Sequence, residues 1–370
     1  MKVLIAGGGT GGHIYPAIAI ADAIKEYDQN AELLFIATKN GMEKRLVEKA
    51  GYPTYHIEMS GLQRNLSLKN FKTLRCFITA PIEAKKLIKS FSPDLAVGTG
   101  GYLCWPLLHS AAKMGIPTAV HESNAIPGVA VKMLEGEVDS ILLNFESVKD
   151  CLKHPEKALC VGNPTVSENR LPSRTEARAN LSVAEKYVLL SFGGSLGSDK
   201  INSAALTLMC EFSSKHPEVL HVHSAGNGRY EKFMREFKFL GLDKFKNLRP
   251  VPYLYDMPAW EAAADAVICR AGAMTVSEMA LYGKACVFIP SPNVAENHQF
   301  HNAARLSEKD AAYVIEEKNL TANLLASDTE SLLFSEKGSE FSKNIKAFAN
   351  PDAKKEILGE LLRIVRKRNS

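Results

Sequence analysis

Near its start the chain reads Val3-Leu4-Ile5-Ala6-Gly7-Gly8-Gly9-Thr10-Gly11-Gly12-His13, a short apolar run that ends in a cluster of glycines. A second junction of this kind, Tyr187-Val188-Leu189-Leu190-Ser191 followed by Gly193-Gly194-Ser195-Leu196-Gly197-Ser198, lies in the other half. At each junction a buried strand runs into a turn where glycine lets backbone N–H groups and a helix N-terminus approach an anion. The repeated junction predicts two doubly wound α/β domains, each with a ligand-binding edge where its first strand ends.

The rest of the chain continues this alternation of short apolar runs and longer amphipathic stretches, which is typical of parallel sheets covered by helices. We expect strands at Val3–Ala6, Leu33–Ala37, Leu95–Val97, Thr118–His121, Ser140–Leu143, Ala158–Val161, Tyr187–Ser191, His221–Ser224, Ala266–Cys269, Cys286–Ile289 and Ala312–Ile315. A polar, proline-marked stretch after residue 162 is typical of a linker. We therefore predict domains at 1–163 and 164–340, and a C-terminal helical segment at 341–370 that packs back on the first domain.

Composition restricts the class of protein. The 370 residues are enough for two domains, and the net charge of +4 is too small to indicate a nucleic-acid partner. Seven cysteines without metal-ligand spacing favour reduced thiols. The first apolar run is too short for a signal peptide, and no run reaches the roughly 18 residues of a membrane span. We expect a cytoplasmic protein whose membrane contact is peripheral.

The first glycine cluster also fits the dinucleotide-binding spacing G-x-G-x-x-G at Gly7, Gly9 and Gly12. An NAD-dependent oxidoreductase would need a carboxylate at the end of its second strand to hold the ribose hydroxyls. That strand ends in Ile36-Ala37-Thr38-Lys39, which contains no acid. The missing acid therefore disfavours an NAD-dependent oxidoreductase, while the glycine loop can still bind an anion.

Three polar residues near the predicted strand ends are candidates for chemistry. His13 opens the helix after the first glycine loop, where a neutral imidazole could take a proton from an attacking hydroxyl. Ser195, with the N–H groups around Gly194 and Gly197, could cradle a pyrophosphate leaving group. Glu278 could grip a ribose, or it could close a capping box with Thr275, and the sequence leaves both readings open.

Taken together, these motifs resemble the MurG family, the bacterial UDP-N-acetylglucosamine transferases of peptidoglycan synthesis. The resemblance extends from Lys2 to about Ile315 and rests on Gly8-Gly9-Thr10-Gly11-Gly12-His13, His121-Glu122-Ser123-Asn124, Val161-Gly162-Asn163-Pro164, Gly193-Gly194-Ser195, Arg270-Ala271-Gly272-Ala273-Met274-Thr275-Val276-Ser277-Glu278 and Gln299. It implies a GT-B fold, inverting chemistry, no obligatory metal and no cofactor. The implied reaction moves N-acetylglucosamine from UDP-N-acetylglucosamine to lipid I, giving lipid II.

The resemblance also implies roles for individual residues. His13 would be the general base for the muramoyl 4-hydroxyl. The donor would be contacted by Thr10, Gly11 and Gly12 (sugar and diphosphate), Asn124 (sugar), Ser195 (phosphate), Leu254 (uracil), Ala273, Met274 and Thr275 (diphosphate and sugar), Glu278 (ribose) and Gln299 (sugar hydroxyls).

Three positions depart from the family pattern. Leu196 replaces the usual glutamine, Thr165-Val166 replaces the arginine that often follows Asn-Pro, and His298 replaces one of two paired glutamines. These changes bear on donor geometry more than on the reaction. Two alternatives stay open: another lipid- or natural-product-directed GT-B glycosyltransferase, and a non-catalytic UDP-sugar-binding subunit.

A polyprenyl-linked acceptor would require contact with the cytoplasmic face of the cell membrane. The stretch Lys69–Lys89 carries six basic residues and one acid, Glu83, interleaved with Phe71, Leu74, Phe77, Ile78, Leu87 and Ile88. The stretch is either an ordinary surface helix or an amphipathic patch that binds anionic lipid. An alternative contact is the loop at Tyr102, Leu103 and Trp105. Other cell-wall synthesis or division proteins would be fitting partners for such an enzyme.

Overall fold

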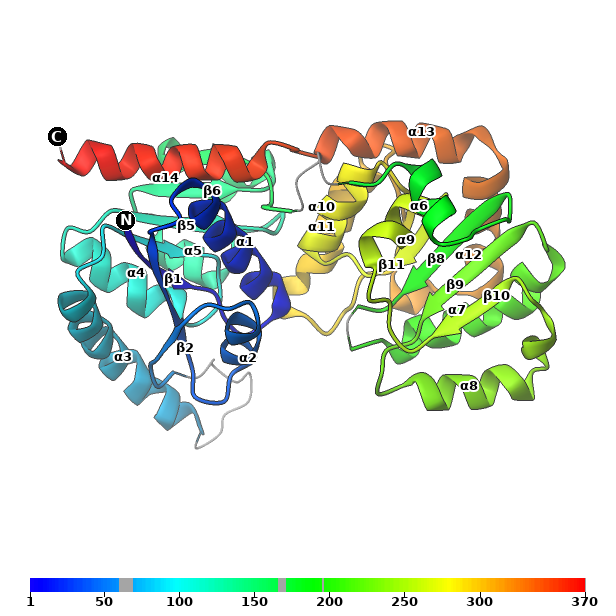
Figure 1. The fold of residues 1–370 in the computed structure, drawn as a ribbon, viewed down its shortest axis with the longest axis horizontal. Coiled ribbons are helices and arrows are strands. Elements are labelled where there is room, and N and C mark those ends of the chain that lie inside the picture. Colours follow the sequence, from blue (N-terminus) through cyan, green and yellow to red (C-terminus); the bar gives the residue numbers. More distant parts are fainter. Residues whose placement is uncertain (60–68, 166–170, 195, 370) are drawn as a thin grey trace. The chain divides into compact units, whose positions relative to one another are not determined.

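The computed structural model describes residues 1–59, 69–165, 171–194 and 196–369. Contacts within the chain divide it into two units, Met1–Thr165 with Asn350–Ser370, and Val166–Ala349. Each unit is built on a parallel sheet with helices on both faces, which confirms the predicted α/β class (Figure 1).

The first unit has its strands in the order β3-β2-β1-β4-β5-β6-β7. Their bounds are β1 Lys2–Ala6, β2 Glu32–Ala37, β3 Thr54–His56, β4 Leu95–Gly98, β5 Thr118–Glu122, β6 Ser140–Leu143 and β7 Ala158–Cys160. The helices are α1 Gly11–Tyr27, α2 Met42–Lys49, α3 Lys69–Phe91, α4 Cys104–Lys113, α5 Val129–Leu134 and α14 Ala353–Asn369. In this order the switch point lies between β1 and β4, so the loops after these strands are adjacent.

The second unit repeats the arrangement as β10-β9-β8-β11-β12-β13. Its strands are β8 Tyr187–Phe192, β9 Val219–Ser224, β10 Leu248–Val251, β11 Ala266–Cys269, β12 Ala285–Phe288 and β13 Tyr313–Val314. Its helices are α6 Arg174–Asn180, α7 Asp199–Glu211, α8 Tyr230–Phe239, α9 Met257–Ala263, α10 Ala273–Tyr282, α11 His298–Ser307, α12 Ala322–Phe334 and α13 Glu336–Ile345. Here the loops after β8 and β11 meet at the switch point.

Two strands, β3 and β10, were not predicted from the sequence. Both are edge strands with a single neighbour. β3 reads Thr-Tyr-His and is largely exposed, while β10 contains Arg249 and Pro250. Edge strands tolerate polar residues and proline because one side makes no ladder hydrogen bonds, so neither strand produces an apolar run.

The C-terminal helix α14 belongs to the first unit, where it lies along α1 (Figure 1). Its Ile357, Leu361 and Ile364 are buried in the same core cluster as residues of α1 and β1. The C-terminal segment begins later than the predicted residue 341, because Phe341 and Ile345 of α13 are buried in the second unit. After the second unit, the chain returns to the first unit at Asn350.

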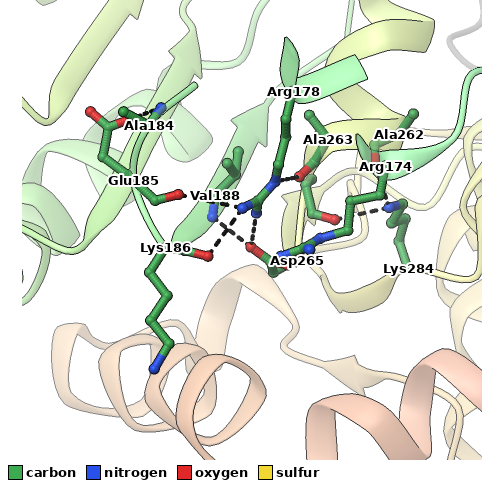
Figure 2. Close-up of polar contacts among 11 residues, drawn as sticks. Arg174, Arg178, Ala184, Glu185, Lys186, Val188, Ala262, Ala263, Asp265 and Lys284 are labelled. Carbon is green, nitrogen blue, oxygen red and sulfur yellow. Dashed lines mark hydrogen bonds and ion pairs between the residues drawn. The ribbon is translucent and has the colours of Figure 1, made fainter. Parts of the chain in front are cut away.

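The start of the second unit is fixed by Asp265, which directly precedes β11 (Figure 2). Its carboxylate accepts hydrogen bonds from Arg174 Nη2 at 2.7 Å, Arg178 Nη2 at 2.5 Å and the backbone N–H of Val188 at 2.7 Å. Beside it, Lys284 Nζ donates to the carbonyls of Ala262 and Ala264 at the end of α9. Since both arginines lie on α6, the network ties that helix to β8 and β11.

Candidate active site

His13 lies in the first turn of α1, directly after the glycine loop that follows β1. Its Nδ1 is 3.0 Å from the carbonyl oxygen of Thr99. A carbonyl oxygen can only accept, so Nδ1 carries the proton and Nε2 keeps its lone pair in the neutral ring. Burial lowers the pKa of His13 below its ordinary value, against the opposing effect of the Thr99 hydrogen bond. The imidazole is therefore neutral at pH 7 and oriented to accept a proton at Nε2.

A second glycine loop, which the sequence analysis did not single out, holds this imidazole in place. It follows β4 and contains Gly100 and Gly101, with φ values of 103° and 85°. A Cβ on Gly100 would lie 2.4 Å from His13 Nδ1, and a Cβ on Gly101 would lie 2.1 Å from the carbonyl oxygen of Gly8. The two loops pack so closely that no side chain fits between them. The only sequence signal was the Gly-Thr-Gly-Gly run from 98 to 101 at a strand end.

The other candidate residues of the first unit lie at the same edge of the sheet. Thr10 is the N-cap of α1, and Gly11 and Gly12 form its first turn. This turn has no acidic residue, so the positive end of the helix dipole can attract an anion. Asn124 follows β5, where its backbone N–H and its amide both donate to Glu122 Oε1 at 3.0 Å. Glu122 also accepts from Gly128 N–H at 2.7 Å, so this buried carboxylate sets the conformation of the Asn124 loop.

In the second unit, the glycine loop after β8 leads into α7. Ser195 lies outside the described residues. Gly194 and Gly197 both have positive φ, and the side chain of Leu196 is 70% exposed. Ser198 is the N-cap of α7, and its hydroxyl accepts a hydrogen bond from Arg270 Nη2 at 2.6 Å. Because Arg270 follows β11, this bond joins the two loops at the switch point.

Helix α10 settles one alternative that the sequence left open. The helix begins at Ala273 with Gly272 as N-cap, and no side chain caps it. Thr275 is thus the third residue of the helix, so the capping box with Glu278 is wrong. Glu278 lies one turn into the helix, and burial raises its pKa to about 7. Ala273 is buried, while Met274 and Thr275 are partly exposed at the same helix start.

The remaining candidates lie on neighbouring loops of the second unit. Leu254 is buried between β10 and α9. Gln299 is in the first turn of α11, where its Oε1 accepts from the N–H of Ser291 at 2.9 Å. One turn on, Asn302 donates to the carbonyl of Ala271 at 3.1 Å. These two amides hold the loops after β11 and β12 together.

The described part of the chain offers neither a metal-binding cluster nor a membrane-spanning helix. No group of three or more His, Cys, Asp or Glu side chains there could hold a metal ion. No helix there is both long and apolar enough to cross a membrane.

Comparison with known proteins identifies the family. Residues 3–143 match the glycosyltransferase family 28 N-terminal domain, and residues 188–357 match its C-terminal domain. An Acetivibrio thermocellus protein named UDP-N-acetylglucosamine--N-acetylmuramyl-(pentapeptide) pyrophosphoryl-undecaprenol N-acetylglucosamine transferase is 40% identical over 359 residues, 96% of each chain. A Bacillus cereus protein with this name, numbered 1, is 40% identical over 375 residues, covering 99% of this chain and all of that one.

Solved structures agree with this assignment. The crystal structure of Acinetobacter baumannii MurG superimposes with a TM-score of 0.78 at 26% identity, covering 98% of this chain and 99% of that one. A Staphylococcus aureus MnaA–UDP structure, at 12% identity and a TM-score of 0.66, shares the fold alone. These likenesses confirm the predicted GT-B fold. The chain therefore belongs to glycosyltransferase family 28 and, within it, to the MurG family of N-acetylglucosaminyltransferases.

Proposed function

We propose that this enzyme transfers N-acetylglucosamine from UDP-N-acetylglucosamine to the muramoyl 4-hydroxyl of lipid I, forming lipid II. Membership of the MurG family supports the donor, the acceptor and the reaction. The observation that carries the chemistry is the orientation of His13, whose Nδ1 is held by Thr99.

The proposed reaction is a single displacement. The acceptor hydroxyl loses its proton to Nε2 of His13 while its oxygen bonds to the anomeric carbon of the donor sugar. The bond from that carbon to the diphosphate breaks, and UDP leaves with the electron pair. Attack from the face opposite the leaving group inverts the anomeric configuration. The N-terminus of α7 and the start of α10 present backbone N–H groups suited to the developing charge on the diphosphate.

The donor contacts are part of the same proposal. Glu278 would accept hydrogen bonds from the ribose hydroxyls, Leu254 would face the uracil, and Gln299 and Asn124 would bind sugar hydroxyls. Thr10, Gly11, Gly12, Ser195, Ala273, Met274 and Thr275 would surround the diphosphate and sugar. Apart from Glu278, which lies one turn into α10, the described members of this set lie at loops or helix starts that follow strands, where ligands bind in doubly wound sheets.

The test is transfer of labelled sugar from UDP-N-acetylglucosamine to a lipid I analogue, with UDP release measured in parallel. His13→Ala should lower turnover by about 10²-fold or more, the scale of a lost general base, with UDP affinity kept. His154→Ala, a half-exposed histidine of the same unit, is the matched control. Transfer to diacylglycerol or sterol instead would support the other glycosyltransferases, and sugar-nucleotide binding without UDP release would support a non-catalytic subunit.

We also propose that α3 binds the cytoplasmic face of the membrane, where a polyprenyl-linked acceptor must be reached. Ile78 and Ile82, one turn apart, are 66% and 52% exposed, and Lys85, Lys86 and Lys89 on the same helix are exposed. An apolar pair beside basic residues is suited to an anionic lipid surface.

The other apolar residues of this stretch differ in position. Leu87 and Ile88 are buried in the core, and Phe77 is partly buried with its ring 5.3 Å from that of Trp105. The side chains of Phe71 and Leu74 lie outside the described part. In the alternative contact at Tyr102, Leu103 and Trp105, Leu103 is fully buried and does not reach the surface.

Liposome co-sedimentation tests the membrane proposal. The Ile78→Ser, Ile82→Ser double variant should lose binding to anionic vesicles while it melts like the wild type. Leu159→Ser, which changes a residue 43% exposed on β7, is the control. Wild-type binding should also weaken with salt. Undiminished binding by the folded double variant would move the contact elsewhere.

A further inference from the structure

Glu43 is a buried carboxylate beside the proposed active site with no role assigned so far. It lies in the first turn of α2 and is 1% exposed. Its Oε1 accepts three hydrogen bonds, from the Thr38 N–H at 3.0 Å, the Thr38 hydroxyl at 2.6 Å and the Tyr102 hydroxyl at 3.2 Å. Its Oε2 is buried and has no hydrogen-bond partner within the described residues.

The third of these bonds connects Glu43 to both glycine loops. Tyr102 ends the loop after β4, and its ring covers Gly9, so that a Cβ on Gly9 would lie 3.2 Å from the ring. The carboxyl carbon of Glu43 lies 3.8 Å from the position of a Cβ on Gly8. The carboxylate thereby links the loops that follow β1, β2 and β4.

The electrostatics indicate that this carboxylate is ionised. Burial alone would raise the pKa of Glu43, but the hydrogen bonds from Thr38 and Tyr102 outweigh it and hold the pKa below its ordinary value. Hydrogen bonds to an ionised acceptor are about twice as strong as neutral ones. The negative charge therefore favours the observed position of the Tyr102 hydroxyl, although the 3.2 Å bond is longer than a typical O–H···O bond. A helix start alone would need only local partners, whereas Tyr102 is 59 residues away in the chain.

We propose that Glu43 is a positioning residue, which holds the Tyr102 ring across Gly9 and thereby fixes the loop that carries Thr10 and His13. Without this hold, Gly8 and Gly9 are free to change conformation, because glycine has many accessible backbone states. The kinetic consequence rests on the proposed transferase function. The structural consequence, a less protected loop, does not.

The test compares Glu43→Gln, Tyr102→Phe and the double variant with Glu48→Gln. Glu48 is a matched control because it is an exposed carboxylate on the same helix, bonded to the Thr54 hydroxyl. Amide hydrogen exchange over residues 7–13 should speed up in the first three variants and stay at the wild-type rate in the control. Exchange in α2 should not change in Tyr102→Phe, which removes one hydroxyl.

In the transfer assay, each single variant should lower kcat by about tenfold, the scale of one lost hydrogen bond to a charged group. The double variant should be no slower than the slower single one, because both changes break the same contact. UDP affinity should fall by less than kcat, because most of the proposed UDP contacts lie in the second unit.

Three results would overturn the proposal: unchanged exchange over residues 7–13, additive losses of kcat, or an equal loss in Glu48→Gln. If Glu43→Gln does not fold, Tyr102→Phe decides alone, and wild-type exchange and turnover in that variant would refute the role of the contact. Absence of transfer by the wild type would count against the proposed function, while the exchange measurements would still decide the role of Glu43.

Discussion

The affinity for UDP should depend on pH near neutrality because of one of two neighbouring carboxyl groups in the second unit. Glu278 is the proposed ribose ligand on α10, and burial raises its pKa to about 7. Glu261 on α9 is 3% exposed, and its pKa is raised by burial and by the negative charge of Glu278, against the opposing effect of Lys284. The proposed ribose contact needs an ionised Glu278, since a carboxylate accepts from two hydroxyls at once.

The size of the effect follows from the pKa of Glu278. With a value of about 7, the ionised fraction falls about tenfold between pH 8 and pH 6. UDP affinity should fall by the same factor, about 1.4 kcal/mol. UDP affinity should therefore fall as the pH is lowered and recover as it is raised. Because the raised pKa of Glu278 is due to burial, and Glu261 ionises only after Glu278, Glu261→Gln should leave the midpoint of the profile close to its wild-type position.

Calorimetric titration of UDP from pH 5.5 to 8.5 measures this dependence. Because the terminal phosphate of UDP titrates in the same range, the quantity to follow is the ratio of the wild-type affinity to that of Glu278→Gln at each pH. With 2′-deoxy-UDP the wild type should lose most of its advantage over the variant. A ratio that stays constant between pH 6 and 8 would refute the assignment of Glu278 to the ribose.

Three further predictions concern single contacts. Gly100→Ala should lower turnover by about tenfold or more, because its Cβ would lie 2.4 Å from the proposed base. Gly51 also has a positive φ, 87° against 103° for Gly100, but open space around it, so Gly51→Ala should keep wild-type turnover in the transfer assay. His221 and His223 are buried with pKa values lowered to about 3, so the folded unit binds fewer protons than the unfolded chain as pH falls below about 6.5. Each histidine should cost the second unit about 2 kcal/mol at pH 5. Because the raised pKa of Glu278 has the opposite effect on stability, the measurement is the change in urea midpoint between pH 7 and 5, followed by tryptophan fluorescence, in the wild type and in His223→Gln, and an equal change in both would contradict this. Asp265→Ala leaves two arginines and a backbone N–H without their acceptor and should cost about 3 kcal/mol of unfolding free energy, measured by urea denaturation at pH 7.

The central strands could be predicted from the sequence because burial on both faces demands continuous apolar runs. β1 and β8, with their glycine junctions, were sufficient to indicate two doubly wound sheets. The edge strands β3 and β10 escaped prediction because half-exposed strands need no such run. Glu278 was found through its motif, but only the start of α10 at Ala273 could exclude the capping box, and the ribose contact stays a prediction.

The residues that position the site could not be predicted for a different reason. His13 stands out because it follows a glycine loop, yet its orientation depends on Thr99 and on the space left by Gly100, 86 and 87 positions later. Glu43 reads in sequence as an ordinary acid in the first turn of a helix. Its contact with Tyr102 exists only because β1 lies between β2 and β4, so that their loops meet. Sequence motifs identify the residues that would contact substrate. The residues that position them lie on other loops, which the strand order brings into contact. Variants of the positioning residues, such as Gly100→Ala and Tyr102→Phe, therefore test more directly than variants of substrate-contacting residues whether the loops after β1 and β4 depend on each other.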